Sequence, residues 1–118
     1  MTSHFEPHEI VAHAVSMVSG KWKVAILSNL SHGPVRYNEL QRLLGPISAK
    51  VLTDQLGEME DDELVTRTPL SISSKSYGYE STNLGIRLWR RLSLFGEFHK
   101  DFSPRTFLST VAESNHIA

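Results

Sequence analysis

The chain has 118 residues, of which 40% are hydrophobic and 21% are charged, and its formal net charge is −1. This size and composition predict one soluble globular domain over residues 1–118. The absence of cysteine excludes disulfides, thiol redox sensing and cysteine metal clusters. No apolar run approaches the roughly 18 residues of a membrane span, and residues 1–10 lack the features of a secretory signal. We therefore expect a cytoplasmic protein with no membrane partner.

The charge is unevenly distributed along the chain. From Lys21 to Gly57 there are five cations and two anions, whereas residues 58–63 carry five acids. A basic surface on a nearly neutral protein can bind phosphate. An excess of this size also arises by chance, so charge alone does not assign a nucleic-acid partner. The acidic run is most simply a solvated end of a helix.

Three helices are predicted in the first third of the chain. Apolar residues recur at helical spacing over residues 7–18 and 21–30, with Gly20 between the two segments. A turn at residues 31–34 then leads to a short amphipathic helix over residues 37–44. The second of these helices is rich enough in apolar residues to be largely buried.

The stretch from Gly45 to Leu64 predicts a turn followed by the best-capped helix of the chain. Ser48 is a suitable N-cap, because its hydroxyl can accept from an amide of the first turn. The expected buried face consists of Leu52, Leu56 and Met59, and the opposite face of Lys50, Thr53, Asp54 and Gly57. Two short helices joined by a tight turn form a helix-turn-helix.

A small β-hairpin is predicted directly after the helix-turn-helix. Residues 64–68 form one β-prone run, which Pro69 ends, and residues 77–79 form a second. The polar loop between them contains Lys75. A hairpin in this position is the wing of a winged helix-turn-helix, so the expected fold class is mainly α with a small β-hairpin.

The last predicted helix begins after Thr82 or Asn83 and continues to about Phe102. Its apolar stripe, which we expect to serve the domain's own core, consists of Leu84, Leu88, Leu92, Phe95, Phe98 and Phe102. Ile86 and Trp89 fall outside this stripe. They indicate a second buried surface, most simply one formed by the terminal helices with a symmetric partner; the alternative is a tryptophan lying on the surface.

Several short motifs follow one another in a fixed order between about Val15 and Phe98. They are Gly20-Lys21-Trp22 with Ile26-Leu27, Arg36-Tyr37-Asn38-Glu39-Leu40, Ile47-Ser48 with Lys50-Val51-Leu52 and Leu56, Leu64-Val65-Thr66-Arg67, and Thr82-Asn83-Leu84-Gly85. This ordered set resembles the HxlR-type winged helix-turn-helix transcriptional regulators, which are related in fold to the MarR group. The resemblance implies a homodimer formed by the terminal helices and a pseudo-palindromic operator.

The chain departs from that family pattern at several positions. Tyr37 replaces a phenylalanine, and Glu63 replaces a glycine that would stop the helix in a left-handed conformation. The sensor cysteine that many relatives carry would fall near Glu9, so any effector response does not use a thiol. Gln55 and Gly57 occupy positions that are often basic in relatives.

In a winged helix-turn-helix the second helix enters the major groove of DNA. The residues expected to face base edges are Ser48, Ala49, Lys50, Thr53 and Asp54. Lys50 suits guanine or a phosphate, and Ala49 and the Thr53 methyl suit thymine methyl groups. Asp54 can accept from cytosine N4, or instead repel phosphate or pair with Lys50. Phosphate contacts are expected from Arg36, Asn38 and Arg42, and wing contacts from Arg67 and Lys75.

The sequence therefore predicts a homodimeric DNA-binding regulator, a repressor, without a cofactor. The alternative is a winged-helix adaptor that binds proteins and has weak or no affinity for DNA. Trp22 is expected in the core, or else in the wall of an effector pocket near the dimer interface. The histidines, among them His13 and His99, give little support to a zinc site. No nucleophile elbow, phosphate loop or carboxylate pair indicates an enzyme.

Overall fold

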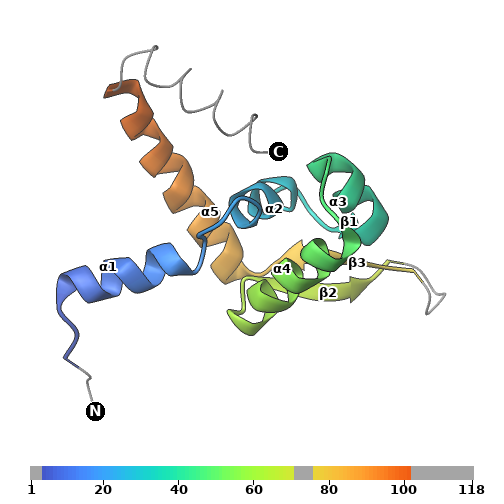
Figure 1. The fold of residues 1–118 in the computed structure, drawn as a ribbon, viewed down its shortest axis with the longest axis horizontal. Coiled ribbons are helices and arrows are strands. Elements are labelled where there is room, and N and C mark those ends of the chain that lie inside the picture. The colour runs from blue at the N-terminus through green and yellow to red at the C-terminus, as the bar shows by residue number, and fades with distance from the viewer. Residues whose placement is uncertain (1–3, 71–75, 102–118) are drawn as a thin grey trace.

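The computed structural model describes residues 4–70 and 76–101 and has the predicted fold class (Figure 1). The elements are α1 (Pro7–Ser16), α2 (Lys23–Asn29), β1 (Val35–Arg36), α3 (Tyr37–Leu44), α4 (Ala49–Asp61), β2 (Val65–Pro69), β3 (Tyr77–Ser81), α5 (Asn83–Gly96) and the 3-10 helix η1 (Glu97–Asp101). Helices α2, α3 and α4 gather with the sheet, whereas α1 and the far end of α5 extend outwards. None of the described helices is both long and apolar enough to cross a bilayer.

Strand β1 and the start of α2 differ from the sequence prediction, and α1 and α5 end earlier than predicted, at Ser16 and at Gly96, where the 3-10 helix η1 follows. Strand β1 was not predicted, because two residues show no period and pair only when β3 lies beside them. Helix α2 begins at Lys23, two residues later than expected. Gly20, with φ of 99°, turns the chain immediately before it, so Lys21 and Trp22 belong to the entry of the helix.

The three strands form an antiparallel sheet in the order β1-β3-β2. Tyr79 lies at its centre, opposite Val35 on one side and Arg67 on the other. Gly78 permits this arrangement, because a Cβ atom there would collide with the backbone carbonyl of Val35. The amide of Leu70 donates to the carbonyl of Ser76 across 3.2 Å and continues the hairpin beyond the strands.

The core lies between α2, α3, α4 and the sheet. The fully buried large side chains are Ile26, Leu27, Leu30, Leu40, Leu52, Leu56, Met59 and Leu64. The predicted buried face of α4 is thus confirmed, and each buried leucine contributes about 2 kcal/mol. Trp22 packs half-buried against this core, as expected. The pKa of the Tyr79 hydroxyl is raised, mainly by burial and to a smaller extent by the negative charge of Glu60.

Helix α4 ends in a Schellman motif centred on Glu63. The amide of Leu64 donates to the carbonyl of Met59 and that of Glu63 to the carbonyl of Glu60, both across 2.9 Å. Glu63 has φ of 61°, the left-handed conformation expected at this position, which costs a non-glycine residue about 1 kcal/mol. Thr82, one of the two candidate caps, starts α5 by accepting from the Gly85 amide at 3.0 Å.

The same threonine joins the end of α4 to the start of α5. The hydroxyl of Thr82 donates to the carbonyl of Glu63 across 2.6 Å, and its amide donates to the carbonyl of Leu64 across 3.1 Å. A Cβ atom on Gly85 would collide with that Leu64 carbonyl. Helix α4, strand β2 of the wing and α5 therefore meet at one backbone junction.

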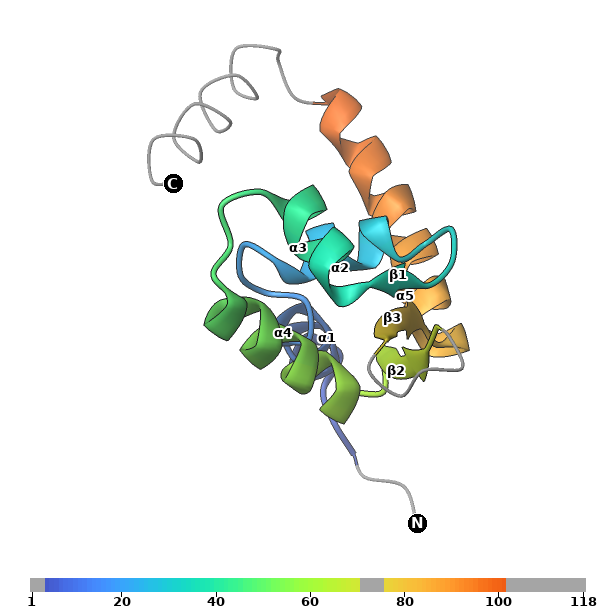
Figure 2. The same ribbon diagram turned by 90° about the vertical axis from the view of Figure 1, so that its right-hand side faces the viewer.

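The apolar stripe of α5 is only partly used by the described core. Leu88 and Leu92 pack against it, but Phe95 and Phe98 are 72% and 51% exposed. Trp89, which was expected outside the stripe, packs against the core instead. The prediction that the whole stripe is buried in the domain is wrong, because α5 runs past the end of the core after Leu92 (Figure 2). Phe102 lies outside the described residues.

Candidate nucleic-acid interface

The predicted helix-turn-helix consists of α3, residues 45–48 and α4 (Figure 2). Ser48 accepts a hydrogen bond from the Val51 amide at 3.1 Å, so the predicted N-cap is confirmed. The side chains on the outer face of the first turns of α4 are all exposed: Ser48, Ala49, Lys50, Thr53 and Asp54. The five residues expected to face base edges thus share one accessible surface of α4.

Tyr37, at the start of α3, connects this surface to the first helix. Its hydroxyl donates to the Ala49 carbonyl at 3.0 Å and lies 2.9 Å from Thr53 Oγ1. The two helices of the motif are therefore joined on their outer side as well as through the core. The sequence identified Tyr37 only as a replacement for phenylalanine in the family pattern.

Lys50 and Asp54 form an ion pair along α4. The ammonium nitrogen lies 2.8 Å from the carboxylate, and both side chains are largely exposed. The hydrogen bond to Asp54, supported by its charge, raises the pKa of Lys50. Of the alternatives open for Asp54, pairing with Lys50 is the one present in this structure.

A second ion pair occupies the outer side of α3. Arg42 donates through Nε to the Glu39 carboxylate at 2.9 Å, and its guanidinium makes a further contact with the other oxygen. This hydrogen bond lowers the pKa of Glu39 and raises that of Arg42. The predicted phosphate-binding cation is thus accessible but already engaged by an acid.

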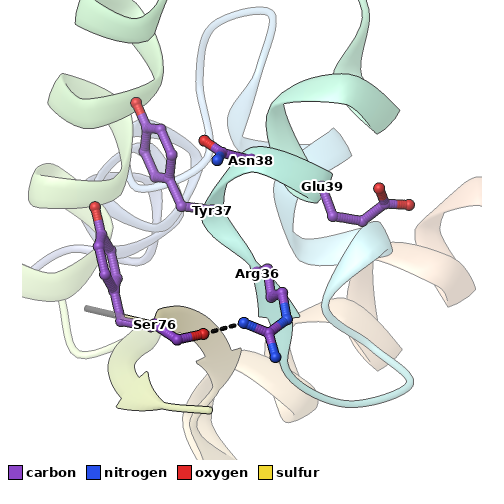
Figure 3. Close-up of a pocket in the computed structure, with 6 residues that line it drawn as sticks. Arg36, Tyr37, Asn38, Glu39 and Ser76 are labelled. Carbon is purple, nitrogen blue, oxygen red and sulfur yellow. Dashed lines mark hydrogen bonds between the residues drawn. The ribbon is translucent and has the colours of Figure 1, made fainter. Parts of the chain in front are cut away.

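Arg36 and Asn38 line an open pocket of about 360 Å³ between the start of α3 and β3 (Figure 3). Arg36 reaches across from the end of β1 and donates to the hydroxyl of Ser76. Asn38 is exposed at the rim. The pocket brings two of the predicted phosphate contacts to the base of the wing.

In the wing, the guanidinium carbon of Arg67 lies over the ring of Tyr77, 3.8 Å from its centroid. This cation–π contact fixes the direction of a long side chain without consuming its hydrogen-bond donors. Lys75, the other predicted wing contact, lies outside the described residues.

The aromatic residues connect these parts into one surface. The rings of Tyr37 and Tyr77 are 6.1 Å apart, so Thr53, Tyr37, Tyr77 and Arg67 form a continuous row from α4 to the wing. Sequence reasoning missed Tyr37, Ser76 and Tyr77 as members of this surface. The available signal was the alternation Tyr77-Gly78-Tyr79, which places Tyr77 and Tyr79 on one side of a strand.

Behind the interface, Lys23 of α2 is anchored on α4. Its side chain is 8% exposed, and its ammonium lies 3.8 Å from the Glu58 carboxylate. Gln55 donates to the other Glu58 oxygen at 3.1 Å. Glu58 is thus 57% exposed, as predicted for a solvated helix end, but its carboxylate also pairs with the buried Lys23.

In the described part of the chain the histidines form no recognisable metal site, and Trp22 lies against the core. Among residues 4–70 and 76–101, no group of three or more His, Asp or Glu side chains could hold a metal ion. Trp22 packs on the core, with the Lys21 ammonium 4.9 Å from its ring centroid.

The sequence is similar to transcriptional regulators along most of its length. The model of the HxlR-like helix-turn-helix family matches residues 17–107. An uncharacterised helix-turn-helix transcriptional regulator from Bacillus subtilis, YtcD, is 37% identical over 66% of this chain and 62% of its own length. A second from the same organism, YdeP, is 31% identical over 77% and 73%. The chain thus spans about three fifths of YtcD.

Solved structures agree with this assignment. A protein described as a MarR-family transcriptional regulator from Enterococcus faecalis superposes with a TM-score of 0.76 at 31% identity, covering 95% of this chain and 97% of that one. The reduced form of the redox regulator HypR gives 0.72 at 27% identity, covering 86% and 98%. YtcD, YdeP and the Enterococcus protein are described as transcriptional regulators and not as enzymes. The chain belongs to the HxlR-like helix-turn-helix family of DNA-binding transcriptional regulators.

Proposed function

We propose that the protein represses transcription as a homodimer bound to a pseudo-palindromic operator. The observation that carries this proposal is the continuous row from Thr53 through Tyr37 and Tyr77 to Arg67, which joins the exposed face of α4 to the wing. A recognition helix and a wing connected in this way can engage adjacent grooves of one duplex.

Each residue predicted to contact DNA has a role in this proposal. The start of α4 enters the major groove, where the side chains that face base edges are Ser48, Ala49, Lys50, Thr53 and Asp54. Arg36, Asn38 and Arg42 hold phosphates and set the register of the protein on the duplex. Arg67 and Lys75 contact the minor groove or its flanking phosphates from the wing.

In this proposal, Lys50 and Arg42 exchange their acidic partners within the protein for DNA when they bind. Lys50 leaves Asp54 and Arg42 leaves Glu39, at distances of 2.8 Å and 2.9 Å in the free chain. Exposed ion pairs contribute only about 0–1 kcal/mol, because water screens them. A hydrogen bond to a phosphate is charge-assisted as well, so the exchange costs little.

The second copy would cover the apolar faces of the two terminal helices. In α1 no residue is buried, and Ile10, Val11 and Val15 are between 57% and 61% exposed. In α5 and η1 the exposed large apolar residues are Leu84, near the start of α5, and Leu94, Phe95 and Phe98 at the far end. Apolar groups in such number on helices that extend from the core are typical of an interface. Two recognition helices related by a two-fold axis would then face successive half-sites.

Fluorescence anisotropy with a duplex from the region upstream of the protein's own gene tests this function. Specific binding is expected to strengthen as salt falls from about 200 to 50 mM, with a log–log slope set by the number of phosphate contacts. Lys50→Ala and Arg67→Ala should each weaken it by about three- to tenfold. If both variants bind as the wild type does, the proposed interface is wrong; if the wild type does not bind, the adaptor alternative is favoured.

Two further points stay predictions. One is that a small-molecule effector binds beside Trp22, and the other is that the protein is cytoplasmic, as its proposed DNA ligand is. Tryptophan fluorescence measured during addition of candidate small molecules tests the first of them. The Trp22→Phe variant separates its signal from that of Trp89.

A further inference from the structure

The hydroxyl group of Tyr37 makes two contacts with one turn of α4. It donates to the carbonyl oxygen of Ala49 across 3.0 Å, and its oxygen lies 2.9 Å from Thr53 Oγ1. A tyrosine hydroxyl carries one proton, and a carbonyl oxygen can only accept. Both contacts are therefore satisfied when Tyr37 donates to Ala49 and Thr53 donates to Tyr37.

This arrangement determines where the Thr53 hydroxyl donates its proton and where it can accept a hydrogen bond. A helical Ser or Thr often gives its proton to the carbonyl four residues earlier, as Ser93 does to the Trp89 carbonyl at 2.9 Å. For Thr53 that carbonyl belongs to Ala49, which accepts from Tyr37 instead. The Thr53 proton points towards α3, so its exposed side chain offers outside groups a free oxygen lone pair and a methyl group.

We propose that Tyr37 is a positioning residue that sets the base preference of Thr53; the inference rests on the DNA-binding function proposed above. In the major groove, adenine N6 and cytosine N4 carry donor amino groups, whereas guanine O6 and thymine O4 are acceptors. A freely rotating threonine hydroxyl serves either kind of group. Held as an acceptor by Tyr37, Thr53 selects an amino-bearing base at the position that it faces and disfavours a keto base.

Selection from a library of random duplex DNA tests the inference with the full chain. The wild type is expected to enrich adenine or cytosine at a symmetric pair of positions, and Thr53→Val identifies those positions by losing the preference there. In Tyr37→Phe the preference for amino over keto bases at the same positions should fall about five- to tenfold, the effect of one hydrogen bond. Retention on unselected DNA should change by less than about twofold, because phosphate contacts remain.

The matched control is Tyr79→Phe, which removes a hydroxyl from a buried tyrosine at the centre of the sheet, outside the proposed interface, and should keep the wild-type profile. The double variant Tyr37→Phe/Thr53→Val should match Thr53→Val alone, because both changes act through one hydroxyl. Equal melting curves for Tyr37→Phe and the wild type would show that the fold is intact.

Two results overturn the inference while leaving the proposed function in place. One is a Tyr37→Phe profile identical to that of the wild type. The other is enrichment of guanine or thymine by the wild type at the Thr53-dependent positions. A wild type that is neither retained on DNA nor selective for any sequence overturns both the inference and the proposed function.

Discussion

The carboxylate of Asp54 lies 2.8 Å from the ammonium of Lys50, one helical turn earlier on the exposed face of α4. This acid holds the cation and also places a negative charge where DNA phosphates would approach. In Asp54→Asn, Lys50 is released and the repulsion disappears. We expect affinity for non-specific duplex to rise about three- to tenfold and the salt slope to steepen by about one phosphate contact, as measured by anisotropy.

The control for this variant is Glu97→Gln, which changes the net charge equally. Glu97 pairs with Lys100 at 2.6 Å in η1, away from the helix-turn-helix. If Glu97→Gln strengthens DNA binding as much as Asp54→Asn does, total charge and not the recognition face is responsible.

The buried Lys23 predicts an asymmetry between the two partners of its ion pair. Glu58→Gln leaves an ammonium in the core without its acid and should lower the free energy of unfolding by about 1–2 kcal/mol. Lys23→Met keeps the chain volume and removes the charge, so stability should stay equal or increase. Urea unfolding at neutral pH measures both, with Glu60→Gln as an exposed control on the same helix. Greater destabilisation by Lys23→Met than by Glu58→Gln would contradict this account.

Gly78 and Gly57 should respond in opposite ways to the same substitution. In Gly78→Ala the new Cβ would collide with the Val35 carbonyl, so β1 must separate from β3. We expect a loss of about 2 kcal/mol or more in stability. In Gly57→Ala the new atom meets nothing within 4 Å, and α4 should gain about 0.5–1 kcal/mol. Thermal unfolding of the two variants shows whether stability falls in Gly78→Ala and rises in Gly57→Ala. A Gly78→Ala variant as stable as the wild type would argue against the close β1–β3 contact.

The exposed face of α1 predicts the oligomeric state. Val11 is 61% exposed, and Val11→Lys should convert a dimer to a monomer whose melting temperature no longer depends on concentration. Leu43, 46% exposed on α3, provides the control, since Leu43→Lys should leave the dimer intact. Sedimentation velocity distinguishes these states. A wild type that is monomeric at every concentration would remove the proposed arrangement of half-sites.

The elements that local signals specify were predictable from the sequence. Ser48 caps α4 and Leu52, Leu56 and Met59 are buried, because capping and helical period act within a few residues. The left-handed conformation of Glu63 was expected from the family resemblance, in which a glycine ends the helix at this position. In each case the deciding interaction spans less than two turns of chain.

Contacts between distant segments could not be predicted in this way. Arg36 donates to a hydroxyl 40 positions later, and β1 exists only because β3 lies beside it. The partners of Lys23 and Tyr37 depend on how α2 and α3 pack against α4, which no local pattern encodes. The sequence therefore predicted the cationic residues of the site but not the groups to which they are bonded.

The junction at Glu63, Leu64, Thr82 and Gly85 is built mainly from backbone groups and one hydroxyl. It fixes where the recognition helix stops and the wing starts, without help from the outward side chains of α4. Gene duplicates can consequently diverge at Ala49, Lys50 and Thr53 while inheriting an unchanged frame. Under the proposed function, new operator specificities would then be accessible by single substitutions, whereas a change at Gly85 would disturb the fold of every descendant alike.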